Sequence, residues 1–343
     1  MDMLTRVANK VAVLLPMVVL LGSCALIGAN GGTPPSTSVP DEEPDQGEGE
    51  EPIHLGLSIH VEGFVGEDTI EQRFSVHRDM VLELATDAYE HGAVVTFELG
   101  PSFVAGVANF DDDVLAQLTS MGHSIAVHAD AGGSGVPTLE EFTAELTEQR
   151  EALAAVGYEV SHVSGICSRG PWVEAAIQAG FSSVSGGVEY CLTSLAPENM
   201  PAGYEWVYEC SDPSTCHGEV SLEGDQQVEP WRTSDSSNWL LPDPAGGLVY
   251  IPGAQGVDFS CIVGRNVNPC SEADEDIATY LTALEEALAV YDGDGTAVFT
   301  VTWSFGDGVP DGYADDFFAA TESYVSSGDA AWAGLDDVAA LVP

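Results

Sequence analysis

Short apolar runs alternate with longer amphipathic segments along residues 53–343 of this chain. The apolar runs are rich in Val, Ile, Phe and Thr, which is typical of buried strands, and they cover 53–60, 93–99, 124–128, 160–166, 181–185, 248–251 and 297–303. Between them, apolar residues recur at helical spacing over 76–91, 111–121, 138–156, 172–179, 272–291 and 314–327. Strands that alternate with helices through short connections predict a parallel sheet covered by helices.

We therefore expect an α/β fold in which about six or seven strands form an irregular parallel (β/α) barrel, fewer than the eight of the regular form. An open doubly wound sheet is the alternative. The length of 52–343 is normal for one such domain. Residues 190–247 lack any period and are rich in Pro, Ser, Asp, Trp and Cys, so we expect a long loop excursion there, pinned by disulfides.

The N-terminal segment has the features of a bacterial lipoprotein signal. Two basic residues precede an apolar run over 11–21, which is too short to span a bilayer comfortably, since a spanning helix needs about 20 residues. The run ends in Leu-Gly-Ser-Cys, which looks like a lipobox. We predict a signal peptide over 1–23 and lipidation of Cys24; an ordinary signal peptide with an incidental cysteine is the alternative.

Residues 24–51 follow with Gly, Pro, Ser and Thr and then a run of Asp and Glu. Such a composition cannot bury a core, so a disordered acidic tether is predicted. The expected location is extracytoplasmic, with the lipid anchor in the bacterial cell envelope, at the outer membrane or the cell surface.

The chain is strongly acidic, with 56 Asp and Glu against 8 Lys and Arg and a net charge of −48 at pH 7. This charge argues against nucleic acid and against anionic membrane surfaces as partners. The only membrane contact expected is the lipid anchor.

Six cysteines follow Cys24, and an even number behind an export signal suggests three disulfides. The favoured pairs are Cys210–Cys216, Cys261–Cys270 and Cys167–Cys191. No C-x-x-C pair is present in the sequence, so a thiolate zinc site is not expected.

Polar residues follow three of the predicted strands, at the end where parallel sheets hold ligands and metals. His60 and Glu62 lie two residues apart and face the same side of a strand, so both could reach a single metal or substrate. His128 ends another strand. Two histidines and one carboxylate with open positions suit a catalytic zinc ion. The alternative is a strand end whose His60 and Glu62 only face solvent.

These segments, in this order, resemble the polysaccharide deacetylase (NodB-homology, carbohydrate esterase family 4-like) family. Gly122, His123, Ile125 and His128 match its glycine–histidine strand motif, and Arg169-Gly-Pro-Trp matches its arginine–proline motif. The resemblance implies a metal-dependent hydrolase that removes acetyl groups from an N-acetylated glycan, cleaving amide bonds.

The resemblance also implies roles for individual residues. His60 would be the catalytic base or a metal ligand, Glu62 and His128 would be ligands, and Arg169 would orient the catalytic group. For Arg169, a structural salt bridge to Glu62 or Asp130 is the alternative. The cofactor implied is a divalent metal, with zinc as the expected ion. His123 precedes its strand and is expected to be structural.

The chain departs from the family pattern at three places. His60 stands where the family has an aspartate base, Gly132 where it has a second histidine ligand, and Trp303 where it has a late histidine acid. Asp130 is a candidate substitute for the missing ligand. For Trp303, a hydrogen bond to a sugar, stacking on it, and ordinary core packing are all open.

These departures leave a rival function, a catalytically inactive carbohydrate-binding surface lipoprotein on the same fold. A third reading is a disulfide-rich surface protein without a sugar ligand. Aromatic residues gathered in the excursion would form either a rim that stacks on sugars or the excursion's own small core; they are Tyr204, Trp206, Tyr208, Trp231 and Trp239.

Overall fold

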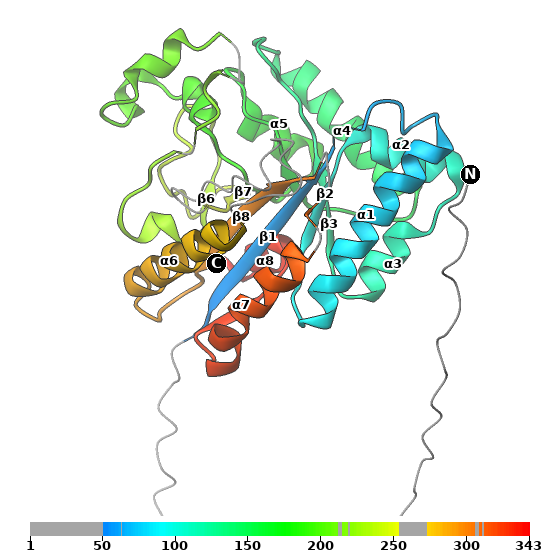
Figure 1. Ribbon diagram of the computed structural model, residues 1–343. Coiled ribbons are helices and arrows are strands. Elements are labelled where there is room, and N and C mark those ends of the chain that lie inside the picture. Colours follow the sequence, from blue (N-terminus) through cyan, green and yellow to red (C-terminus); the bar gives the residue numbers. More distant parts are fainter. Residues whose placement is uncertain are drawn as a thin grey trace, which may run out of the picture. The chain divides into compact units, whose positions relative to one another are not determined.

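A curled, mostly parallel sheet forms the centre of the protein (Figure 1). Its strands are β1 (Ile53–Val61), β2 (Thr96–Leu99), β3 (Ser124–His128), β4 (His162–Ser164), β5 (Ser183–Val184), β6 (Trp231–Thr233), β7 (Leu248–Tyr250), β8 (Val298–Ser304) and β9 (Ala330–Trp332). The strand order is β6-β7-β5-β4-β3-β2-β1-β8, with β9 paired to β1. Only the β6–β7 pair is antiparallel among the pairs of the described residues. The sheet is a half-barrel, which confirms the predicted irregular (β/α) barrel. Its described part has nine strands and not the six or seven expected, because β6 and β9 were not predicted.

The computed structural model describes residues 51–62, 64–211, 215–218, 220–253, 273–305, 309–310 and 312–343. The predicted signal peptide, Cys24, almost all of the predicted tether and the Cys261–Cys270 pair lie outside these residues. The described residues all belong to one compact unit, Gly49–Pro343.

Eight helices accompany the described strands: α1 (Glu71–Glu90), α2 (Pro101–Phe110), α3 (Val114–Ser120), α4 (Leu139–Ala155), α5 (Trp172–Ala179), α6 (Ala273–Val290), α7 (Tyr313–Ser327) and α8 (Leu335–Leu341). Helix α4 begins with a capping box, in which the Thr138 side chain accepts from the Glu141 amide. Helix α2 was not predicted; it begins with Pro101 directly after Gly100, without a polar segment to mark it. Within the described part of the chain, no helix combines the length and apolar character needed to cross a membrane.

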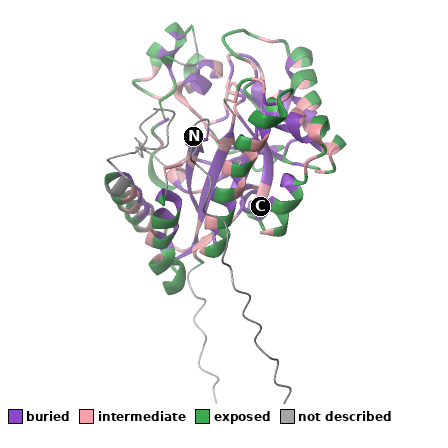
Figure 2. Ribbon diagram, turned by 45° about the vertical axis from the view of Figure 1, so that its right-hand side comes forward, coloured by how far each residue is buried: buried purple, intermediate pink, exposed green. Residues whose placement is uncertain are grey.

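The main core lies where the helices pack on the sheet, and Figure 2 shows buried strands beneath helices whose outer faces are exposed. A smaller apolar cluster joins α8 to strands β7 and β8. Its Leu335 packs close to Gly56 of β1, because a side chain at Gly56 would approach Leu335 to 2.7 Å. The Leu335 amide also donates to the Thr96 hydroxyl at 2.9 Å. The concave side of the sheet is therefore closed by α8 near the start of β1.

The predicted excursion after β5 is present as short 3₁₀ turns, with bounds Glu189–Ser194, Pro197–Asn199, Glu205–Glu209 and Gly224–Gln227. The Cys167–Cys191 and Cys210–Cys216 disulfides are confirmed. Trp231 and Trp239 are buried against the Tyr250 ring, with centroids 4.6 and 4.9 Å away. These two tryptophans therefore belong to the main core of the protein, which corrects both expectations, a sugar-stacking rim and a separate small core of the excursion.

Candidate metal centre

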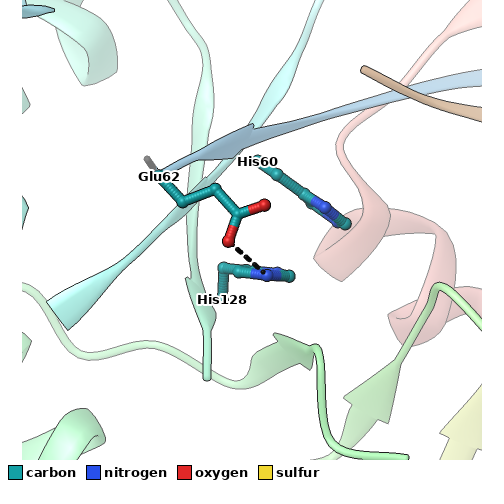
Figure 3. Close-up of side chains that lie close together, drawn as sticks. All are labelled: His60, Glu62 and His128. Atoms are coloured by element: carbon teal, nitrogen blue, oxygen red, sulfur yellow. Dashed lines mark ion pairs between the residues drawn. The ribbon is translucent and has the colours of Figure 1, made fainter. Parts of the chain in front are cut away.

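Three residues predicted as metal ligands converge at the carboxyl ends of β1 and β3 (Figure 3). His60, Glu62 and His128 offer ligand atoms that all lie within 4.8 Å of one another. Glu62 Oε2 lies 3.1 Å from His128 Nε2. The rings of His60 and His128 lie 3.9 Å apart between centroids, tilted by 32°. His60 and Glu62 thus take part in one cluster and do not simply face solvent.

The register of the parallel strands explains why this cluster forms. His60 pairs with Glu98, and Leu99 pairs with Val127. The same register, continued past the strand ends, places Gly100 between Glu62 and His128. A side chain at Gly100 would come within 3.0 Å of a β1 carbonyl and 3.6 Å of the Glu62 Cβ. Because Gly100 has no side chain, Glu62 reaches across β2 to His128.

Burial and neighbouring charges shift the pKa values of the three cluster residues in different directions. Burial lowers the pKa of His60, and His128 lowers it further, which outweighs the opposite effect of Glu98. Burial also lowers the pKa of His128, but the hydrogen bond to Glu62 and nearby carboxylate charges raise it overall. The same hydrogen bond lowers the pKa of the Glu62 carboxyl. The cluster therefore presents an ionised carboxylate beside two imidazoles.

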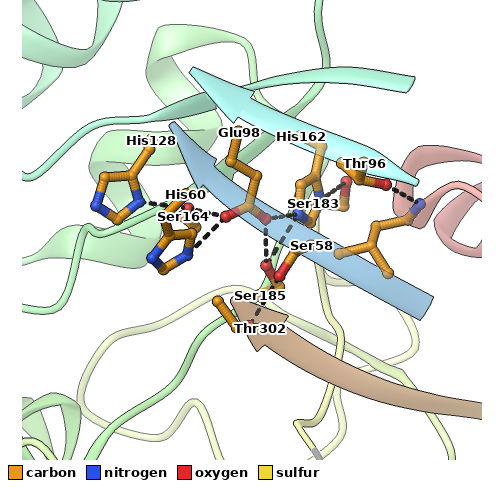
Figure 4. Close-up of polar contacts among 11 residues, drawn as sticks. Ser58, His60, Thr96, Glu98, His128, His162, Ser164, Ser183, Ser185 and Thr302 are labelled. Carbon is orange, nitrogen blue, oxygen red and sulfur yellow. Dashed lines mark hydrogen bonds and ion pairs between the residues drawn. The ribbon is translucent and has the colours of Figure 1, made fainter. Parts of the chain in front are cut away.

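A buried polar network lies directly beneath the cluster (Figure 4). Its centre is Glu98 of β2, which is fully buried. Glu98 Oε2 lies 2.8 Å from His60 Nε2 and accepts a hydrogen bond from Ser164. Glu98 Oε1 accepts from Ser185 at 2.9 Å and lies 3.3 Å from His162 Nε2. Burial raises the pKa of this carboxyl, but its interactions with His162 and His60 hold it well below the usual range.

Glu98 and His162 were not among the site residues predicted from the sequence, although both lie within predicted strands. A signal was present, because Glu98 interrupts the otherwise apolar Phe97–Leu99 stretch before Gly100. A charged residue in a buried strand needs a partner, and His162 lies in another predicted strand. The pairing between them depends on strand order, which the sequence pattern does not give.

His217 is a second residue that the sequence analysis did not single out. Its charge contributes to lowering the pKa of Glu62, which places it within electrostatic reach of the cluster. The Cys210–Cys216 disulfide and a 2.9 Å hydrogen bond from the Tyr190 amide to the Cys216 carbonyl hold this segment.

Arg169 is not brought into the cluster. Its guanidinium donates to the Tyr208 carbonyl at 3.4 Å, and the described residues include no ion pair between Arg169 and either Glu62 or Asp130. Its orienting role stays a prediction. Asp130 is exposed with φ of 44°, and it does not join the three clustered ligands.

The structure gives physical reasons for two departures from the family pattern. Gly132 has φ of 82°, and a side chain there would lie 2.9 Å from both Phe142 and Ser168. No ligand side chain fits at this position. Trp303 is fully buried and packs edge-on against Phe317, with centroids 4.8 Å apart. It is a core residue, and it is not placed to stack on a sugar.

His123 is structural, as expected. It is buried, its Nε2 lies 2.9 Å from the Ala85 carbonyl, and its Nδ1 accepts from the Val95 amide at 3.2 Å. Both ring nitrogens are thus used to join a helix to the sheet.

Comparisons with known proteins identify the fold. No protein-family model and no curated protein matches the sequence. A protein from Pseudomonas aeruginosa PAO1 assigned as a probable polysaccharide deacetylase matches with a TM-score of 0.50 and 11% identity, covering 85% of this chain and 91% of its own. This likeness confirms the predicted polysaccharide deacetylase (NodB-like) fold, and it concerns the fold alone.

Two further solved structures match with TM-scores below 0.50. A protein from Mycobacterium smegmatis assigned as a polysaccharide deacetylase has a TM-score of 0.48 and 14% identity, covering 85% of this chain and 91% of its own. A 4-alpha-glucanotransferase from Thermococcus litoralis has a TM-score of 0.49 and 14% identity, covering 84% of this chain and 40% of its own. Because one fold hosts several chemistries, function has to be argued from the site.

Proposed function

We propose that this protein is a metal-dependent hydrolase of the polysaccharide deacetylase type, which removes acetyl groups from an N-acetylated glycan. The observation that carries the proposal is the convergence of His60, Glu62 and His128 at the carboxyl ends of the strands. Ligand sites of parallel α/β folds lie at this edge.

The donor set fits a divalent metal. Two imidazole nitrogens and one carboxylate oxygen suit zinc, and three protein ligands leave a position open for water or substrate. A bound zinc ion would polarise an acetamide carbonyl and lower the pKa of a water molecule. Glu62 and His128, already 3.1 Å apart, would hold the ion, and His60 would act as a ligand or as the base.

Two exposed aromatic residues of the excursion support the substrate class. Trp206 and Tyr208 are 44% and 39% exposed. They lie on the 3₁₀ turn that accepts the Arg169 hydrogen bond, next to the loop after β4. Exposed aromatic faces suit stacking on sugar rings.

Two observations favour the rival function, a catalytically inactive carbohydrate-binding protein on the same fold. Gly132 has no room for a further ligand, and Trp303 is buried where the family resemblance implies an acid. A binding protein would keep the aromatic rim and would release no acetate.

Elemental analysis of the purified protein tests the proposal. We expect about one zinc per chain, as for a single catalytic site. Glu62→Gln and His128→Asn should lose the metal, whereas the surface variant His91→Gln should keep it. The metal site would be contradicted if Glu62→Gln and His128→Asn kept their zinc, or if the wild type held no metal after zinc is supplied.

Acetate release from N-acetylglucosamine oligomers separates the two functions. Release by the zinc-loaded wild type, abolished in Glu62→Gln, supports the hydrolase. Zinc binding and oligomer binding without release would instead favour the carbohydrate-binding protein.

We further propose that residues 1–23 are removed and that the chain is anchored through a lipid on Cys24, with 24–51 as a tether in the cell envelope. The support is the sequence pattern around Cys24. Labelling of expressing cells with a fatty-acid analogue should mark the wild type and leave Cys24→Ser unmarked. A label that persists in Cys24→Ser would contradict the assignment.

A further inference from the structure

The network below the cluster contains a carboxylate that the proposed chemistry does not use. Glu98 is fully buried and has no solvent-exposed surface. Four polar side chains surround its two oxygens: His60, His162, Ser164 and Ser185. A carboxylate is acceptor-only, so any hydrogen bond between these groups and Glu98 is donated to the carboxylate.

Glu98 acts directly on His60. The cross-strand register places the two residues opposite each other on β1 and β2. His60 Nε2 lies 2.8 Å from Glu98 Oε2. With its hydrogen on Nε2, a neutral His60 ring keeps the lone pair on Nδ1.

Glu98 acts on His128 through Ser164. The Ser164 hydroxyl has a single hydrogen, and it donates this hydrogen to Glu98. Its contact with His128 Nδ1, at 2.9 Å, must then be one in which Ser164 accepts. His128 therefore carries a hydrogen on Nδ1 in either charge state. The protonated ring has a second hydrogen on Nε2, which it donates to Glu62 at 3.1 Å; when this second hydrogen is lost, the lone pair is left on Nε2, beside Glu62.

The other oxygen of Glu98 is held in place from the opposite side. Ser185 donates to Oε1 at 2.9 Å, and His162 Nε2 lies 3.0 Å from the Ser185 hydroxyl and 3.3 Å from Oε1. The Ser183 hydroxyl lies 2.9 Å from His162 Nδ1 and completes the arrangement. A carboxylate fixed on both oxygens cannot rotate away from His60 and Ser164.

We propose that Glu98 is a positioning residue that sets the ring orientation and the protonated nitrogen of both histidine ligands, directly for His60 and through Ser164 for His128. The inference rests on the proposed metal site and adds one shared carboxylate behind two ligands. Carboxylate partners of ligand histidines fix the tautomer and make the ring a better ligand, and their loss weakens metal binding by about 10- to 100-fold.

The experiment combines zinc affinity with the proton positions of the histidine rings. Zinc titration of Glu98→Gln should show a dissociation constant raised by about 10- to 100-fold. Two-bond proton–nitrogen NMR spectra of the zinc-loaded wild type should show a hydrogen on Nε2 of His60 and on Nδ1 of His128. In Glu98→Gln the His60 pattern should become mixed, which a merely structural role would not cause.

Ser164→Ala provides an independent variant, and Ser236→Ala is its matched buried control, because its hydroxyl also donates to a glutamate, Glu174. Ser164→Ala should disturb the His128 pattern and leave that of His60 unchanged. Ser236→Ala, which removes a hydroxyl outside the Glu98 network and away from the ligands, should leave both patterns and the affinity unchanged. Should Glu98→Gln not fold, the contrast between these two serine variants decides the inference.

Equal zinc affinity and unchanged ring patterns in Glu98→Gln, beside a wild type that binds zinc, would overturn the role of Glu98 and leave the proposed function standing. Failure of the wild type to bind zinc would overturn the proposed function instead. The ring patterns of the metal-free protein at alkaline pH would then still report whether Glu98 orders the two histidines.

Discussion

Substituting Gly132 should destabilise the protein sharply, although the family pattern places a side chain there. The residue lies in the loop after β3 with φ of 82°. A left-handed conformation costs a residue with a Cβ about 1–2 kcal/mol. A Cβ would also lie 2.9 Å from Phe142 and 2.9 Å from Ser168, and both of these are fully buried.

The neighbouring Gly133 provides a matched control. It also has positive φ, at 44°, but no atom lies within 4 Å of the position of its Cβ. Forcing an extra group into packed surroundings costs about 1–3 kcal/mol. Loss of glycine freedom in the unfolded chain offsets about 0.4–1 kcal/mol in both variants. We therefore expect the free energy of unfolding to fall by about 3 kcal/mol in Gly132→Ala and by about 1 kcal/mol in Gly133→Ala.

Urea unfolding followed by circular dichroism measures both free energies of unfolding. The contrast of about 2 kcal/mol between the variants is the tested quantity, because the two share the backbone strain. Equal stabilities would refute the crowding argument. In that case Gly132→His becomes feasible, and it should be tested for tighter zinc binding; if crowding holds, Gly132→His should unfold more easily without gaining affinity.

Three further outcomes are expected. Zinc at a hundredfold excess over its dissociation constant should raise the free energy of unfolding by about 2.7 kcal/mol, reversed by chelator and absent in His128→Asn. The hydrogen bond to Asp315, together with Glu322, raises the pKa of His91 despite its partial burial. The stability that protonated His91 contributes is therefore present below the pKa of His91 in the unfolded chain. It is lost as the pH rises through the pKa of His91 in the folded protein. His91→Asn should accordingly cost up to about 1 kcal/mol at pH 5.5 and less at pH 9, and the reverse order would contradict this. Trp239→Ala should cost about 3–5 kcal/mol in urea unfolding, because the ring is fully buried; a loss below 1 kcal/mol would show that this aromatic cluster is not part of the core.

The local sequence determined much of the architecture. Apolar runs identified β1 and β3, and helical spacing identified α5 with its observed bounds, because burial on one face leaves a period of two or 3.6 residues. The Thr138 capping box and the Cys210–Cys216 disulfide were also predictable, since both join residues close in sequence.

Other elements were not readable from the pattern. Helix α1 begins at Glu71, before its first apolar core residue, Phe74, so its first turn carried no periodic signal. Strands β6 and β9 have three residues each, and neither contains the Val or Ile that marked the equally short β4, β5 and β7. Trp303 looked equally suited to a sugar and to a core, and only its neighbours, contributed largely by α7, decided for the core.

The candidate site shows the same division. The apolar runs indicated which residues stand at strand ends, and therefore that His60, Glu62 and His128 were candidate ligands. That Gly100 leaves the gap between Glu62 and His128, and that Glu98 lies behind both histidines, became visible only in the folded protein. The reason is physical: strand periodicity is a local property of the chain, whereas cross-strand neighbours depend on strand order and register, which arise from contacts between residues far apart in sequence.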